Sequence, residues 1–153
     1  MTEEKELYQV SGQLAKGFQG HITYTTIFPP EYNKLMVKFC FDKREPVQTE
    51  QLQQQCKSAF LQNNPAACVA QPILQQLCTM PKGEINVSVF SQDTCIGTAH
   101  RNALEKVFEI SSCCATEGFS PCKPQGIIKI VLHVLSVVND DTHYTLQVKG
   151  GTI

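Results

Sequence analysis

The chain has 153 residues, of which 42% are hydrophobic and 18% are charged. Its 13 Lys and Arg residues against 14 Asp and Glu residues give a formal net charge of −1. This composition excludes a wholly disordered chain, which needs low hydrophobicity and high net charge, and the basic surface of a nucleic-acid-binding protein. The length predicts a single domain over 1–153 that can form a hydrophobic core without disulfide bonds.

The first part of the chain alternates polar and apolar residues, which is typical of half-buried β-strands. We predict strands at about 7–11, at 20–28 and at 34–41. The second of these stops at Pro29 because proline cannot donate a hydrogen bond to a β-ladder. The five residues of 29–33 have the length of a hairpin loop, so we expect 20–28 and 34–41 to pair with each other.

From residue 46 to residue 80 the chain is rich in Gln and Ala and poor in β-branched residues, which favours helix. Thr49 is a suitable N-cap for a first helix, and Pro72 suits the first turn of a second one. The first helix would carry one apolar stripe, formed by Leu52, Cys56 and Phe60. Because 46–80 is too short for a domain, we predict a two-helix insertion packed on a sheet.

Alternation resumes after Gly83. The predicted elements are a strand through Ile85, Val87 and Val89, a turn at 91–93, a strand at 95–100, a long loop at 111–125, and two strands at 126–138 and 142–148. Residues 103–110 fit a helix or a strand, and the alternation over 107–110 favours a strand. We expect the last two strands to form a hairpin around a turn at 139–141.

The 126–138 strand is apolar on both faces, which is typical of a central strand covered on both sides, by helices or by a partner subunit. The count is then seven or eight strands and two helices. Frequent turns between short strands favour antiparallel pairing. The predicted fold is therefore mainly β, an antiparallel β-sandwich with a two-helix insertion at 46–80.

Two segments resemble a known family. Residues 83–97, GEINVSVFSQDTCIG, combine an alternating strand, an acidic loop and an Ile-Gly that opens the next strand. This pattern resembles the C-terminal half of a C2-type β-sandwich, and residues 126–134, GIIKIVLHV, are similar to that family's closing strand. The resemblance, over 83–134, implies a sandwich and a peripheral membrane-binding module. The family binds calcium through several Asp residues, whereas the matching loop here has Asp93 beside Gln92, so we expect neither calcium nor lipid binding.

The eight cysteines lack the spacing of a zinc site and lie at 40, 56, 68, 78, 95, 113, 114 and 122. The acidic start of the chain does not match a secretion signal, and no apolar stretch is long enough to span a membrane. We therefore predict a cytoplasmic protein in which disulfides are disfavoured. Most of these cysteines are interpreted as small packing residues, with a metal site, a redox site or disulfides as alternatives.

The 111–125 loop is the main candidate surface, because long loops without secondary structure are often functional. Its candidate residues for an interaction or thiol site are Cys113, Cys114, Phe119, Cys122 and Lys123. A reactive thiol needs a neighbour that lowers its pKa, such as a cation, and Lys123 is the local cation. The alternative is a structural connection in which Phe119 packs into the core.

The four histidines suggest no metal site. The expected closing hairpin pairs His133 with residue 147 and His143 with residue 137, too far apart to share an ion. His21 and His100 lie near the ends of other predicted strands. We find no nucleophile elbow and no nucleotide-binding loop, so we assign no catalytic, metal or cofactor-binding residue and favour a protein that is not an enzyme.

These observations leave three hypotheses for the function. The first is a non-enzymatic β-sandwich that binds a protein partner or itself, since near-zero net charge favours association. The second is a thiol-redox or metal-binding protein that uses Cys113, Cys114 and Cys122. The third is a peripheral membrane-binding module of the C2 type. The sequence identifies no ligand, partner or pathway.

Overall fold

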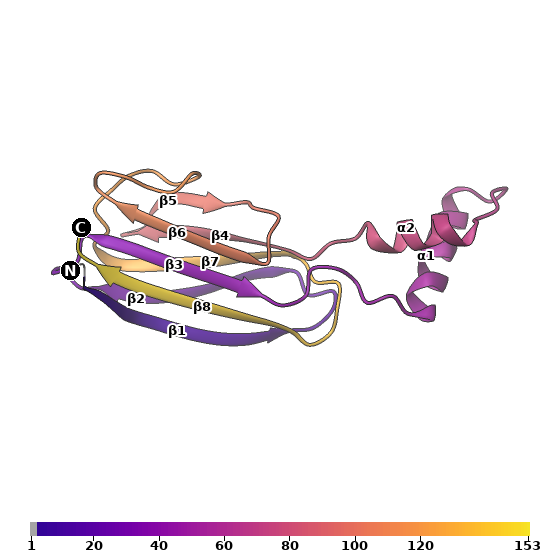
Figure 1. Ribbon diagram of the computed structural model, residues 1–153, viewed down its shortest axis with the longest axis horizontal. Helices are drawn as coiled ribbons and strands as arrows, with labels where there is room; N and C mark the ends of the chain where they lie inside the picture. The colour runs from indigo at the N-terminus through magenta and orange to yellow at the C-terminus, as the bar shows by residue number, and fades with distance from the viewer. Residues whose placement is uncertain (1–2) are drawn as a thin grey trace.

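The computed structural model describes residues 3–153 as two four-stranded antiparallel sheets packed face to face, with a helical arm (residues 46–80) at one end (Figure 1). Sheet A contains, in spatial order, β1 (Glu4–Leu14), β8 (Thr142–Gly151), β3 (Lys34–Phe41) and β6 (Glu105–Ser111). Sheet B contains β2 (Gly20–Phe28), β7 (Gly126–Ser136), β4 (Glu84–Ser91) and β5 (Thr94–Ala99). The predicted antiparallel sandwich with a two-helix insertion is confirmed.

The connections between strands cross from one sheet to the other, except at the turn between β4 and β5. This strand order is that of a jelly roll. Gln92 and Asp93 form the β4–β5 turn with positive φ angles of 48° and 65°, as a two-residue hairpin turn of type I′ requires. Of residues 103–110, which fitted a helix or a strand, residues 105–110 belong to strand β6, so the favoured strand is confirmed there.

Both predicted hairpins are wrong. β2 pairs with β7 rather than with β3, and β8 pairs with β1 and β3 rather than with β7. The two loops, at 29–33 and 137–141, instead carry the chain across the sandwich. Two packed sheets are about 10 Å apart and five residues can span roughly 17 Å, so a loop of this length suits a crossing as well as a hairpin.

The core lies between the two sheets and is filled from both. In β7, the central strand with two apolar faces, Ile130 and Leu132 point inward and are buried. On its outer face, Ile127 is 49% exposed and Leu135 is 46% exposed. The prediction of a central strand is confirmed. The helices do not cover the outer face of β7, and cover by a partner subunit stays a prediction.

The helical arm begins and ends as the sequence indicates. Helix α1 (Glu50–Asn63) is capped by the side chain of Thr49, which accepts a hydrogen bond from the Leu52 N–H at 3.1 Å. Helix α2 (Gln71–Thr79) has proline in its first turn. The expectation that these helices pack on a sheet is wrong, since α1 packs against α2 and the pair projects beyond the sandwich (Figure 1). Cys56 of the α1 stripe contacts α2 instead: the Cys78 thiol hydrogen-bonds with the Cys56 thiol and lies 4.0 Å from the Leu52 carbonyl oxygen.

The two ends of the arm are held together where they leave the sandwich. The Gly83 N–H donates to the Arg44 carbonyl at 2.7 Å. The Asn139 side chain accepts from the Val47 N–H at 2.8 Å and donates to the Glu45 carbonyl at 2.7 Å. The chain therefore leaves the sandwich for the arm and returns to it at the same place.

Within residues 3–153, no helix has the length and apolar character needed to cross a membrane.

Candidate functional site

Apolar side chains of the arm are uncovered. Val47 is 63%, Ile73 49% and Met80 71% exposed. Among the residues of α1, all of which the structure describes, none is buried, and α2 buries Leu74 and Cys78. The arm thus has more apolar surface than its two helices cover.

The two helices of the arm are also too short to be very stable on their own. α1 has 14 residues and α2 has 9, and isolated helices shorter than about 12–15 residues are marginal in water. Most helical stability in proteins comes from tertiary packing, and the two helices bury only Leu74 and Cys78 fully. A further surface over the arm would therefore stabilise it.

At the end of the sandwich opposite the arm, two neighbouring thiols lie side by side just after β6. The Cys113 and Cys114 sulfur atoms are 3.9 Å apart, and the Ser111 hydroxyl lies 3.4 Å from each of them. The backbone of this turn is fixed, because the Ser111 N–H donates to the Cys114 carbonyl at 2.8 Å. The Cys114 N–H donates back to the Ser111 hydroxyl at 3.2 Å. Ser111 therefore positions both thiols, and sequence reasoning did not identify it.

The environment of Cys113 favours its thiolate. Hydrogen bonds from Ser111 and then from Cys114 lower the pKa of the exposed Cys113 thiol from its ordinary value. The expected cause, the positive charge of Lys123, is not among the causes of this shift. Lys123 instead lines a hollow beside Cys122 and Cys95.

The remaining loop candidates have structural positions. Phe119 is buried and stacks on Phe108 with ring centroids 4.3 Å apart. Cys122 is half-buried, and burial raises the pKa of its thiol. The structure thus separates the five predicted residues into a solvent-facing pair, Cys113 and Cys114, and a group that packs or lines the hollow.

The 111–125 loop is better ordered than its composition suggests. It forms bridges to the edges of both sheets, at Gly97–Phe119 and Ile110–Ala115. Gly97 has a φ of 157°, and a Cβ there would lie 2.1 Å from the Gly118 carbonyl oxygen. Glycine at this position therefore permits the close approach that closes this side of the sandwich.

A polar row on the outer face of sheet B was missed by the sequence analysis. His21, His133 and Asn86 lie opposite one another on β2, β7 and β4. The two imidazole rings meet edge to face, with centroids 4.7 Å apart. The predicted pairing of His133 with residue 147 is wrong because β7 and β8 lie in different sheets, and finding the true neighbours requires the strand register.

The surroundings of His133 favour its neutral form. Burial, and then the nearby His21 and His100, lower its pKa from the ordinary value of 6.5. Its Nε2 lies 2.7 Å from the hydroxyl of Ser88, which is itself 2.7 Å from the Thr98 hydroxyl. Ser88 is 4% exposed, so this arrangement is a closed polar network that leaves no accessible nucleophile.

The described residues, 3–153, include no group of three or more His, Cys, Asp or Glu side chains able to hold a metal ion.

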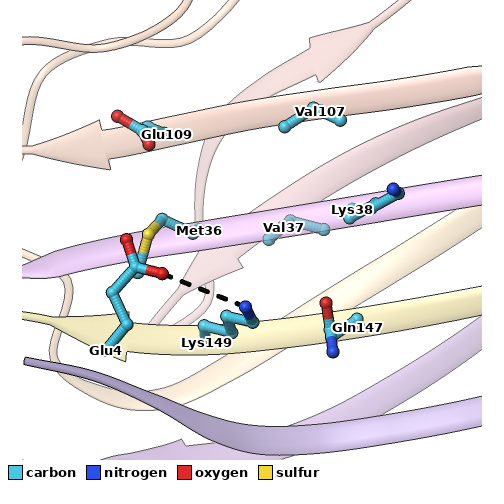
Figure 2. Close-up of a pocket in the computed structure, with 8 residues that line it drawn as sticks. All are labelled: Glu4, Met36, Val37, Lys38, Val107, Glu109, Gln147 and Lys149. Atoms are coloured by element: carbon cyan, nitrogen blue, oxygen red, sulfur yellow. Dashed lines mark ion pairs between the residues drawn. The ribbon is translucent and has the colours of Figure 1, made fainter.

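The outer face of sheet A is charged and solvated (Figure 2). Its cross-strand ion pairs, with N–O distances of 3.0–3.9 Å, are Lys34–Glu109, Lys38–Glu105 and Lys149–Glu4. A hollow of about 200 Å³ lies between them, next to Met36, and Figure 2 shows Lys149 and Glu4 reaching toward each other beside it. Small-molecule sites occupy roughly 300–1,000 Å³, so this hollow is too small to indicate a ligand.

One family model matches almost the whole chain. The model of a family described as "Family of unknown function (DUF6669)" matches residues 4–151. No curated protein and no solved structure matches.

Proposed function

The chain belongs to DUF6669, a family of unknown function, and we propose that it is a self-associating interaction domain in which the helical arm of one copy binds the arm of a second copy. The observation that carries this proposal is the uncovered apolar surface of an arm that packs on neither sheet. Burial of such surface is the dominant favourable term in protein association.

The charges of the arm support a second copy as the partner. Residues 46–80 contain one acidic and one basic residue, Glu50 and Lys57, so the arm has no net charge. When two arms pack together, neither therefore brings an excess of like charge to the other. Two-fold dimers are the commonest symmetric assemblies, and a net charge of −1 on the whole chain adds little repulsion.

The outer face of sheet B is the competing surface. Ile27 on β2 is 73% exposed, and Ile127 lies directly opposite it on β7. This face is mainly uncharged, but its strands are already ordered by the core beneath them. The arm has no such core beneath it, so a partner that covers the arm would stabilise it more than a partner on sheet B would stabilise the sheet.

The membrane-binding alternative has less support. The acid at the β4–β5 turn, Asp93, forms an ion pair with Lys129 and is not available to a cation without breaking it. The strand order of the sandwich is that of a jelly roll. The topology therefore gives no support to the C2 type.

Matched isoleucine variants test the proposal. Ile73→Glu places a charge on the arm, and Ile27→Glu places the same charge on sheet B as a control. Light scattering after size exclusion, with sedimentation at several concentrations, measures the mass of each variant, and circular dichroism checks its folding. We expect a dimer for the unaltered chain and for Ile27→Glu, and a folded monomer for Ile73→Glu.

Two results would overturn the proposal. One is an unaltered chain that remains monomeric at high concentration. The other is loss of the dimer in Ile27→Glu with the dimer retained in Ile73→Glu, which would place the interface on sheet B.

A further inference from the structure

We propose that Cys113 and Cys114 form a thiol–disulfide exchange site that reacts with small disulfides such as oxidised glutathione and closes to a reversible disulfide between the two neighbouring residues. This inference is independent of the arm and of self-association. It rests on a pair of exposed sulfurs 3.9 Å apart that share one serine hydroxyl.

The geometry brings both sulfurs to one side of the chain. A disulfide requires the two sulfurs to approach to about 2.0 Å, so the observed separation must shorten by roughly 2 Å. Ser111 holds both thiols within 3.4 Å of its hydroxyl, and its backbone closes the turn around them. Since both thiols are exposed, a small disulfide can reach them.

The reaction proceeds in two balanced steps. In the first, the Cys113 thiolate attacks one sulfur of oxidised glutathione, forms a mixed disulfide and releases one glutathione thiolate. In the second, the Cys114 thiolate attacks the Cys113 sulfur and releases the second glutathione thiolate. The two cysteines are thereby oxidised, and the glutathione disulfide, which is the oxidant, is reduced to two thiols.

The surroundings make this pair more reactive than the buried Cys78 and the half-buried Cys122. The thiolate is the attacking species, and the hydrogen bonds from Ser111 and Cys114 favour the Cys113 thiolate. In contrast, burial raises the pKa of Cys122, and it raises the pKa of Cys78 to about 11. Exposed Cys95 shares a hollow with Cys122, but the raised pKa of the Cys122 thiol disfavours the thiolate that would resolve a mixed disulfide there.

The experiment treats the folded, reduced full-length chain with oxidised glutathione, quenches it with acid and labels the remaining thiols with N-ethylmaleimide. Peptide mass spectrometry then gives the state of each cysteine. In the unaltered chain we expect the peptide with Cys113 and Cys114 to have lost two hydrogens and to carry neither label nor glutathione. In Cys114→Ser we expect glutathione to accumulate on Cys113. Dithiothreitol should restore two labelled thiols in the unaltered chain.

Two further variants serve as controls. Cys95→Ser should leave the reaction of the pair unchanged. Ser111→Ala should slow the first step, by roughly threefold for each unit by which the pKa of Cys113 rises, because tenfold less thiolate is partly offset by higher nucleophilicity. The proposal is overturned if the pair in the unaltered chain keeps two labelled thiols while Cys95 gains glutathione. It is also overturned if glutathione stays on Cys113 with Cys114 present.

Discussion

The sandwich should fold without the arm, and this follows from how the arm is attached. We consider a variant in which 48–80 is replaced by about six Gly and Ser residues. The hydrogen bond between Arg44 and Gly83 shows that the two ends of the excised segment already meet. Glu45, Val47 and Asn139 are retained, so the bonds at the base of the arm are kept.

The expected gain in stability comes from the shorter loop. Closing a flexible loop costs about (3/2)RT ln n, so shortening it from roughly 33 residues to about six lowers the cost by about 1.5 kcal/mol. That is an upper value, because the helices already restrict the segment when they are formed. It corresponds to a rise in melting temperature of roughly 5 °C at most.

Thermal and urea unfolding followed by circular dichroism measure the effect. The reference is the monomeric variant Ile73→Glu, because association would itself stabilise the unaltered chain. We expect the shortened variant to melt at the same temperature as the reference or up to about 5 °C higher, and to be a monomer. A melting temperature clearly below that of the reference would refute the reasoning, since it would mean that the arm supports the sandwich core.

Three further predictions concern the sandwich itself. Phe119→Ala should lose about 3–5 kcal/mol of unfolding free energy, measured in urea, because its ring is buried against Phe108; a loss below 1 kcal/mol would contradict the core assignment. Gly97→Ala should destabilise the sandwich by more than about 1 kcal/mol in the same assay, because its Cβ would collide with the Gly118 carbonyl, and a neutral change would contradict the close approach. The lowered pKa of His133 means that the unfolded chain binds this proton at a higher pH than the folded chain, so its contribution to stability is full above pH 6.5 and decreases as the pH falls through the folded pKa. His133→Gln should remove that decrease. If the unfolding free energies of the two proteins, measured at several pH values, change with pH in the same way, the expectation is contradicted.

Local features of the fold were predictable because they depend on neighbouring residues. The bounds of β2 and β3 follow from alternation and from Pro29, and the start of α1 follows from the Thr49 cap. Strand partners were not predictable, since β2 pairs with β7, which lies about a hundred residues further along the chain. An alternating pattern shows that a strand has one apolar face but does not show which strand lies beside it.

The same distinction applies to the candidate site. Cys113 and Cys114 are adjacent in the chain, so the sequence alone was enough to group them. Ser111 was not identified, although its place two residues before Cys113 could have marked it as a hydrogen-bond partner. His21 and His133 become neighbours only through the β2–β7 register. Uncovered apolar residues in the arm were equally hidden, because the stripe of α1 would look the same whether it faced a sheet or α2.

The edges of the sheets offer another route to self-association, and the fold obstructs three of the four. β1 carries Glu4, Lys5 and Glu6 and has a bulge after them, two features that discourage pairing with another strand. The 111–125 loop bonds to the edges of β5 and β6. β2 remains, and the Ile27→Glu control lies on it, so loss of the dimer in that variant would identify β2 or the adjoining face. The arm has neither net charge nor cover, and this contrast with the protected edges is the physical reason to expect the interface there.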